Sequence, residues 1–532
     1  MSYDRFNNLK RGTACLACRR RKTRCDGGQP VCNHCIEGNR VDDCEYSDGL
    51  TLTATQTYEE SIRQLEARKR DLEAASASTT AGLPFQLHQP YDPQVSQPDV
   101  GTAQEPNPDI ATRLVDTFLP YSSELGFFLH PQRFKAGLAL PEPAGHPARP
   151  APALLFAVYL WGIRLSGNAD CLTHEPSFHA RAIEEAAANL SSDHPHRIVH
   201  GIQADILLAY YYIAQEKFVK AGHYVTSAMT TALSASLHTI RSRHTQSGVE
   251  ENGERILAMW NVFVLDKMSA IVTGQMPNFV TVNDRPDRRV DVPWPMDMVG
   301  YEQGQVPPQL RTERTVDKFL NNEPTSDGQH NAAMTVLAKA AFLWEKASDI
   351  AQQCIPGLTQ AQYASLAFER RKTELLIEGL EAYIPPTAQL VAVGTVEDVR
   401  KRIFWASVLR AAMIKLHEPV LRMNPGDDAS RSRVLIAALG IFDIAIATTG
   451  RGVGFLNPFV AYAWVNAARV VSSQIVYLRG MRQAWEAQSG AESTLIGRLD
   501  QAVRAMESFA SILPIFRSKV AEVQRIYESL SL

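Results

Sequence analysis

Six of the chain's eight cysteines lie close together near the N-terminus, and their spacing constrains the fold more than any other feature. They follow the pattern C-x2-C-x6-C-x6-C-x2-C-x8-C, at positions Cys15, Cys18, Cys25, Cys32, Cys35 and Cys44. A C-x2-C pair can turn two thiolates toward one tetrahedral metal ion. Clustered cysteines in a reducing compartment bind metal more often than they form disulfides. The spacing therefore predicts a small module held together by metal.

The number of sulfurs indicates how many ions the module holds. One zinc ion uses four cysteines and leaves two without a role. Two zinc ions need eight bonds, which six thiolates supply if two of them bridge. The symmetry of the spacing favours Cys15 and Cys32, the first cysteine of each half, as the bridging ligands. We therefore expect two zinc ions per chain.

Charge is distributed unevenly over this module, although the whole chain has a formal net charge of only -3. The segment from Lys10 to Cys25 contains seven basic residues and no acid, whereas residues 26–46 contain five acids and one base. The basic residues are Lys10, Arg11, Arg19, Arg20, Arg21, Lys22 and Arg24. A zinc module that only docks on acidic proteins remains an alternative. The separation of charge into a cationic and an anionic half favours a module whose cationic half binds the phosphates of a nucleic acid.

The stretch ACLACRRRKTRCDGGQPVCNHCIEGNRVDDCEY resembles the fungal binuclear zinc cluster family of transcription factors. All six cysteines, the basic run after the second one, and Pro30 match the family's pattern. The resemblance implies binding to double-stranded DNA in the nucleus. It also implies that Lys22 reads a CGG-type triplet, that Arg21 lies near the bases, and that Arg19 and Arg24 hold phosphates.

A short heptad pattern follows the cysteine module. Tyr58, Ile62, Leu65, Lys69 and Leu72 recur at steps of four and three, which is the spacing of a coiled-coil seam. The pattern predicts a parallel homodimer over residues 55–75, with Tyr58, Ile62, Leu65 and Leu72 in the seam. A lone amphipathic helix remains the alternative.

Composition divides the rest of the chain into a linker and a large helical region. Residues 76–109 hold six prolines and no Lys or Arg, which is typical of a disordered linker. From residue 110 to 530, apolar residues recur at helical spacing between polar breaks, so we expect an all-α domain. One stripe contains Phe218, Val225, Met229, Leu233 and Leu237, and an apolar helix is expected to end near Gly274. These segments also resemble the family's regulatory region.

Other classes of function find little support in the sequence. The first ten residues are polar and lack the apolar core of a secretory signal. The apolar runs at 152–163 and 434–447 are expected to be core helices, so no membrane partner is predicted. The chain contains neither a phosphate-binding G-x-x-x-x-G-K-[ST] loop nor an H-E-x-x-H metal motif. His194, His196 and His200 are interpreted as surface or packing residues, and TTGRGVGF as a loop after a helix.

Together these patterns predict a mostly α protein with a zinc-stapled DNA-binding module at 10–46, a short coiled coil, a linker and a regulatory domain. The predicted function is a zinc-dependent, sequence-specific transcription regulator of RNA polymerase II genes, acting in the nucleus as a homodimer with co-regulators or transcription machinery. A small-molecule effector of the helical domain is possible in such a protein. The alternatives are an interaction module without DNA specificity and an enzyme in the helical region.

Overall fold

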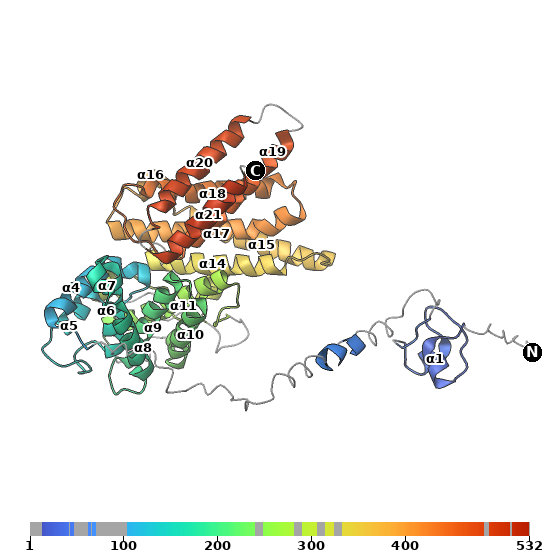
Figure 1. Ribbon diagram of the computed structural model, residues 1–532, viewed down its shortest axis with the longest axis horizontal. Coiled ribbons are helices and arrows are strands. Elements are labelled where there is room, and N and C mark those ends of the chain that lie inside the picture. The colour runs from blue at the N-terminus through green and yellow to red at the C-terminus, as the bar shows by residue number, and fades with distance from the viewer. Residues whose placement is uncertain are drawn as a thin grey trace, which may run out of the picture. The chain divides into compact units, whose positions relative to one another are not determined.

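The computed structural model describes residues 13–41, 43–46, 62–64, 66–70, 104–239, 248–280, 290–305, 314–323, 332–482, 489–510 and 513–530. Contacts divide the chain into two compact units, residues 1–97 and 98–532. Every regular element of the described residues is a helix (Figure 1), which confirms the predicted mostly α class.

The first unit contains two very short helices, α1 (Leu16–Arg21) and α2 (Asn33–Glu37). Residues 62–64 and 66–70 are also helical. Helices of five or six residues are unstable alone, so α1 and α2 need support from outside themselves. The core between them consists of the six cysteines and Ala17, with Ala14, Val31 and Tyr46 packed against it. Sulfur atoms thus occupy the place of an apolar core.

The first half of the second unit surrounds the apolar helix α6. The elements in order are α4 (Pro108–Phe118), η1 (Leu119–Leu125), α5 (Pro131–Leu138), α6 (Pro152–Leu165), α7 (Ala169–Leu172), α8 (Glu175–Asn189), α9 (Arg197–Ala214), α10 (Phe218–Ser234), η2 (Leu237–Thr239) and α11 (Val249–Thr273). Helix α6 packs against α4, α8 and α9, and α10 connects α9 to α11. Residues 153–163 of α6 are all buried, as expected of a helix that is apolar on every side.

The second half is a stack of longer helices. Its elements are α12 (Met298–Glu302), α13 (Thr315–Leu320), α14 (Ala333–Gln353), α15 (Gln360–Glu381), α16 (Thr387–Leu390), α17 (Val396–Met423), α18 (Asp428–Thr448), α19 (Val460–Arg482), α20 (Ser489–Glu507) and α21 (Pro514–Ser529). Helix α14 contacts α11 and α17, α17 contacts α18, and α18 contacts α19. Capping boxes at Thr359 and Thr395 start α15 and α17.

The sequence predictions for α10 and α11 agree with the structure. Val225 and Met229 of the predicted stripe are buried in α10. That helix ends at Ser234, so Leu237 belongs to η2 instead. Helix α11 ends at Gly274, which adopts a left-handed conformation with φ 68°. Among the described helices, α11 alone is long and apolar enough to cross a membrane. However, 78% of its most apolar 18-residue segment is buried inside the protein, so its hydropathy reflects a position in the core.

A buried polar network joins the two halves of the second unit. The Asn457 amide N–H donates to the Glu124 carboxylate at 2.8 Å, and Asn457 Nδ2 donates to the Glu124 carbonyl at 2.6 Å. Burial raises the pKa of Glu124 to about 7, and the nearby Arg400 guanidinium opposes this shift. Arg400 itself donates to the carbonyls of Pro120 and Val453. Residues distant in sequence are therefore tied together at the start of α17.

The predicted domain limits remain predictions. Most of the predicted linker, 76–109, lies outside the described residues. Its last six residues are described, and among them Glu105 forms an ion pair with Arg149, while α4 begins at Pro108.

The close approach of α4 to α6 generates a stability prediction. A Cβ atom at Gly162 would lie 2.4 Å from the Leu114 carbonyl oxygen, whereas a Cβ at Gly222 in α10 meets no atom within 4 Å. Gly162→Ala should lower the free energy of unfolding by about 1–3 kcal/mol because α4 and α6 must separate. Gly222→Ala, the matched control, should raise it by up to about 1 kcal/mol. Chemical denaturation measures both, and equal effects would contradict the prediction.

Candidate metal centre and nucleic-acid interface

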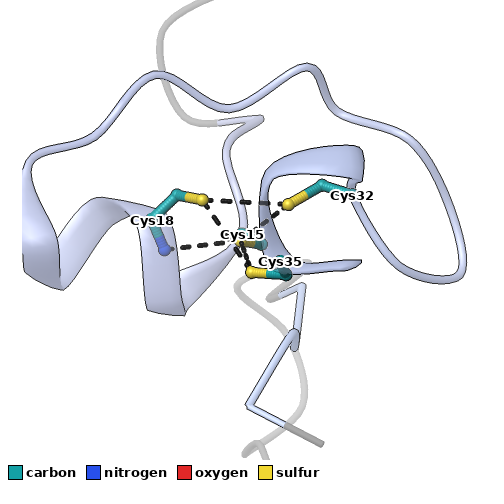
Figure 2. Close-up of side chains that lie close together, drawn as sticks. All are labelled: Cys15, Cys18, Cys32 and Cys35. Atoms are coloured by element: carbon teal, nitrogen blue, oxygen red, sulfur yellow. Dashed lines mark hydrogen bonds between the residues drawn. The ribbon is translucent and has the colours of Figure 1, made fainter. Parts of the chain in front are cut away.

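Four cysteine sulfurs of the first unit converge on one point (Figure 2). The Sγ of Cys15 lies 3.7 Å from that of Cys32 and 3.9 Å from that of Cys35. The Sγ of Cys18 lies 3.8 Å from that of Cys32 and 4.0 Å from that of Cys35. Zinc–sulfur bonds of about 2.3 Å in a tetrahedron place the sulfurs about 3.8 Å apart. The separations therefore match the edges of a zinc–thiolate tetrahedron.

The two short helices present their N-termini to this sulfur cluster. Cys15 precedes α1 and Cys32 precedes α2, each in an extended conformation at the N-cap position. The Cys18 amide N–H donates to the Cys15 sulfur at 3.4 Å. Helix N-termini favour negative charge, so both helices stabilise thiolates here. The C-x2-C spacing thus places one sulfur at the cap and the second within the helix.

The two remaining cysteines lie beside Cys32. The Cys32 amide N–H donates to the Cys44 sulfur at 3.3 Å. Cys25 and Cys32 belong to a second potential metal-binding group, in which the ligand atoms lie within 4.8 Å of one another. The Cys32 sulfur therefore lies near sulfurs of the first half, those of Cys15, Cys18 and Cys25, while the Cys32 backbone contacts Cys44 of the second half. This arrangement supports the bridging role that the spacing predicts for Cys32.

Burial makes the thiols of Cys18 and Cys35 depend on a cation. Desolvation and neighbouring sulfurs raise the pKa of Cys18 to about 12, and burial likewise raises the pKa of Cys35. Without metal these thiols stay protonated at neutral pH, because a thiolate in this position is poorly solvated. The donor set suits zinc, which supplies the compensating charge and displaces the protons.

Two residues that the spacing did not single out complete the module. The Asp26 carboxylate accepts the Asn33 amide N–H at 3.0 Å and so caps α2. The Tyr46 hydroxyl donates to the Gly28 carbonyl at 2.9 Å and lies 3.8 Å from the Cys25 sulfur. Asp26 directly follows Cys25 and lies six residues before Cys32, so its position in the sequence does not mark it as a cap of α2. Nothing in the cysteine pattern marks the tyrosine.

The cationic face forms at the other end of α1. Arg19, Arg20 and Arg21 make up its last turn, where positive charge complements the helix dipole. Lys22 is the residue after the helix, with φ 54°, and its amide N–H bonds to the carbonyls of Cys18 and Arg19. All of these side chains and that of Arg24 are exposed. The sequence predicts a helix after Cys18, whereas the helix begins before it and ends before Lys22.

Several predicted site residues lie outside the described part of the chain. They are Lys10, Arg11, Tyr58, Leu65 and Leu72. Ile62 of the predicted seam is described, lies in a helical segment and is 55% exposed in the single chain. The seam and the DNA contacts therefore remain predictions.

Two clusters in the second unit have the composition of functional sites. The rings of His194, His196 and His200 lie 5.1 to 5.8 Å apart. His194 contacts the Arg149 carbonyl at 3.0 Å, and burial lowers the pKa of His200 to about 3. These contacts fit the packing role expected from the sequence.

The second cluster has the residue types of a hydrolase triad, which sequence reasoning missed. Ser430 Oγ lies 2.9 Å from His417 Nδ1, and His417 Nε2 lies 3.3 Å from Glu374 Oε1. All three are at most 2% exposed, so a substrate cannot approach the hydroxyl. Arg371 and Arg433 also pair with Glu374. The cluster ties α15 to α17 and α18.

Comparisons with known proteins match both units. Residues 13–51 match the fungal Zn(2)-Cys(6) binuclear cluster domain, and residues 117–341 match the fungal specific transcription factor domain. A stretch of 34 residues is 62% identical to part of the C6 finger domain transcription factor hasF of Aspergillus fumigatus (strain CBS 144.89 / FGSC A1163 / CEA10). That alignment covers 6% of this chain and only 4% of the relative. No solved structure matches the chain. The binuclear domain binds two zinc ions, which confirms the predicted cofactor.

The predicted bridging role of Cys15 generates a metal-binding prediction. Cys15→Ser should remove both zinc ions and unfold α1 and α2, because a bridging sulfur would serve both ions and the helices depend on the metal. Cys44→Ser should leave one ion bound, and Cys171→Ser in the helical unit should retain two. Native mass spectrometry counts the ions. Equal zinc content in the first two variants would contradict the bridging role of Cys15.

Proposed function

Because the chain carries both domains of the fungal binuclear zinc cluster transcription factor family, we propose that it is a zinc-dependent DNA-binding transcription regulator. The observation that carries this proposal is the pair of short helices fixed by convergent sulfurs, with exposed cations at the end of α1. Such an arrangement gives the cations fixed positions relative to one another. Fixed positions are what recognition of a base sequence requires.

The predicted contacts divide into two kinds. Arg19 and Arg24 are assigned to phosphates, which set affinity and its dependence on salt, and Arg20 and Arg21 belong to the same DNA-binding run, with Arg21 near the bases. Lys22 is assigned to the O6 and N7 acceptors of guanine in a CGG-type triplet. Its exposed side chain at the position immediately after α1 supports this role. Lys10 and Arg11 are proposed as additional phosphate contacts.

A second copy of the chain is proposed as the partner. One triplet holds too little information to define a site among many competing sites in a genome. A seam of Tyr58, Ile62, Leu65 and Leu72 would pair two modules and so two triplets. The exposure of Ile62 in the single chain fits a position that a second copy covers.

Action in the nucleus and control by the helical unit follow from the same assignment. The basic run at 19–24 also resembles a nuclear import signal. The match over residues 117–341 supports a regulatory role for the second unit. The competing proposal, a zinc module that docks on acidic proteins, predicts binding to any polyanion. Fluorescence anisotropy with a CGG-containing duplex against heparin and a scrambled duplex separates the two.

Substitution of Lys22 tests the base contact. Lys22→Ala should weaken binding to the CGG duplex by about 1–3 kcal/mol and reduce the preference over the scrambled duplex. Lys22→Gly should behave in the same way, because glycine adopts the positive φ without strain and only the side chain is lost. Arg40→Ala on the anionic half is the control and should change neither quantity. Equal weakening on both duplexes would reduce Lys22 to a phosphate contact.

Substitution of Ile62 tests the seam. Ile62→Asp should shift the full-length protein from dimer to monomer, because a carboxylate in the seam is desolvated without a partner. Gln64→Asp introduces the same side chain two residues away, off the seam, and should leave the dimer intact. Sedimentation velocity measures both. A dimer that persists in Ile62→Asp would place the pairing surface elsewhere.

A further inference from the structure

A cleft lies between three helices in the C-terminal half of the second unit. It has a volume of about 510 Å³ and is bounded by α17, α18 and α19. Each of these helices packs against the other two, so the walls belong to one group of three mutually packed helices. The volume falls within the range of about 300–1,000 Å³ that is usual for small-molecule sites.

The walls of the cleft are mainly apolar. The apolar side chains that line it are Ile414, Leu421, Pro425, Val434, Leu435, Val470, Val476 and Tyr477. Ile414 and Val434 are buried at the base, whereas Val476 is 58% exposed at the rim. An apolar concave surface of this kind gains free energy when a hydrocarbon or aromatic body replaces water.

The polar residues of the lining are unequal in charge. Four cations contribute to it, namely Lys415, Arg422, Arg431 and Arg469, against one carboxylate, that of Glu418. Glu418 lies 2.9 Å from Lys415 and 3.5 Å from Arg422, so these two cations share one carboxylate. Arg469 pairs with Glu522 at 2.6 Å. The positive charge of Arg431 is only weakly balanced, because its ion-pair partner, Asp428, is 3.8 Å away and 89% exposed to solvent.

Arg431 is held in a fixed orientation inside the cleft. Its guanidinium carbon lies 3.4 Å from the centre of the Tyr477 ring, and it donates to the Pro425 carbonyl. Its Nε atom is buried and lies 3.8 Å from the Asp428 carboxylate, beyond hydrogen-bond distance. The side chain as a whole is 16% exposed and belongs to the lining of the cleft. A guanidinium that is stacked on an aromatic ring and has only a distant, exposed carboxylate beside it is a suitable partner for a ligand oxyanion.

We propose that the cleft between α17, α18 and α19 binds an amphipathic carboxylate, with its carboxylate at Arg431 and its apolar body along α17 and α19. The charge of the lining favours an anion over a neutral molecule or a cation. The apolar walls favour a ligand with a hydrocarbon or aromatic body over a small inorganic anion. This binding concerns the helical unit alone and stands independently of the DNA contacts proposed for Lys22.

The first test uses dodecanoate as the probe with the full-length, zinc-loaded protein. Isothermal titration calorimetry below the micellar concentration should show binding that is about tenfold or more tighter than for dodecanol, because a charge-assisted hydrogen bond is worth about 1.5–3 kcal/mol. Dodecyltrimethylammonium and acetate should bind more weakly still, since one carries the wrong charge and the other lacks an apolar body. Binding of dodecanol or of the cation as tightly as dodecanoate would overturn the proposal.

Variants then locate the site. Arg431→Gln removes the charge, and Ser473→Trp fills the cleft from α19, where Ser473 is exposed. Each should weaken dodecanoate binding about tenfold or more, whereas Arg504→Gln, at an exposed cation of α20, should leave it unchanged. Circular dichroism should show the same helix content in all three variants. Unchanged affinity in both cleft variants would place the carboxylate elsewhere and reject this cleft.

Discussion

The first unit depends on the contact between the sulfurs of Cys15 and Cys32, which lie 3.7 Å apart at the start of two helices. Neither helix has enough residues to persist alone, and the module has almost no hydrocarbon core. Zinc therefore supplies the folding free energy that burial supplies in a larger domain. Because the same sulfurs set the relative positions of the helices, they also set where the cations of α1 point.

The sequence was most informative where chemistry imposes strict spacing. The positions of the six cysteines predicted the metal and the ion count, because four sulfurs can surround an ion in few ways. The same pattern did not reveal that Lys22 follows α1 in a left-handed conformation. Lys22 ends α1 as a left-handed cap, a position that glycine or asparagine usually takes, so a lysine there gives no signal of the helix end.

Helical periodicity predicted the class of the second unit but not its polar interior. The burial of α10 and the end of α11 at Gly274 follow from residue spacing and a single glycine. The contacts of Glu124 with Asn457 span 333 positions in the sequence, and no pattern in a single chain indicates which distant residues meet. The cleft around Arg431 was equally hidden, since its walls come from three helices whose spacing specifies burial and not concavity.

The bonds of Arg400 limit how this protein can be divided. The family match ends at residue 341, inside α14, while Arg400 reaches back to the carbonyl of Pro120 and forward to that of Val453. A boundary drawn at the end of the matched segment would cut a helix and leave Glu124 without its amide partner. Recombination between related genes would therefore have to exchange both halves of the helical unit together. The two halves are expected to be inherited as a single segment.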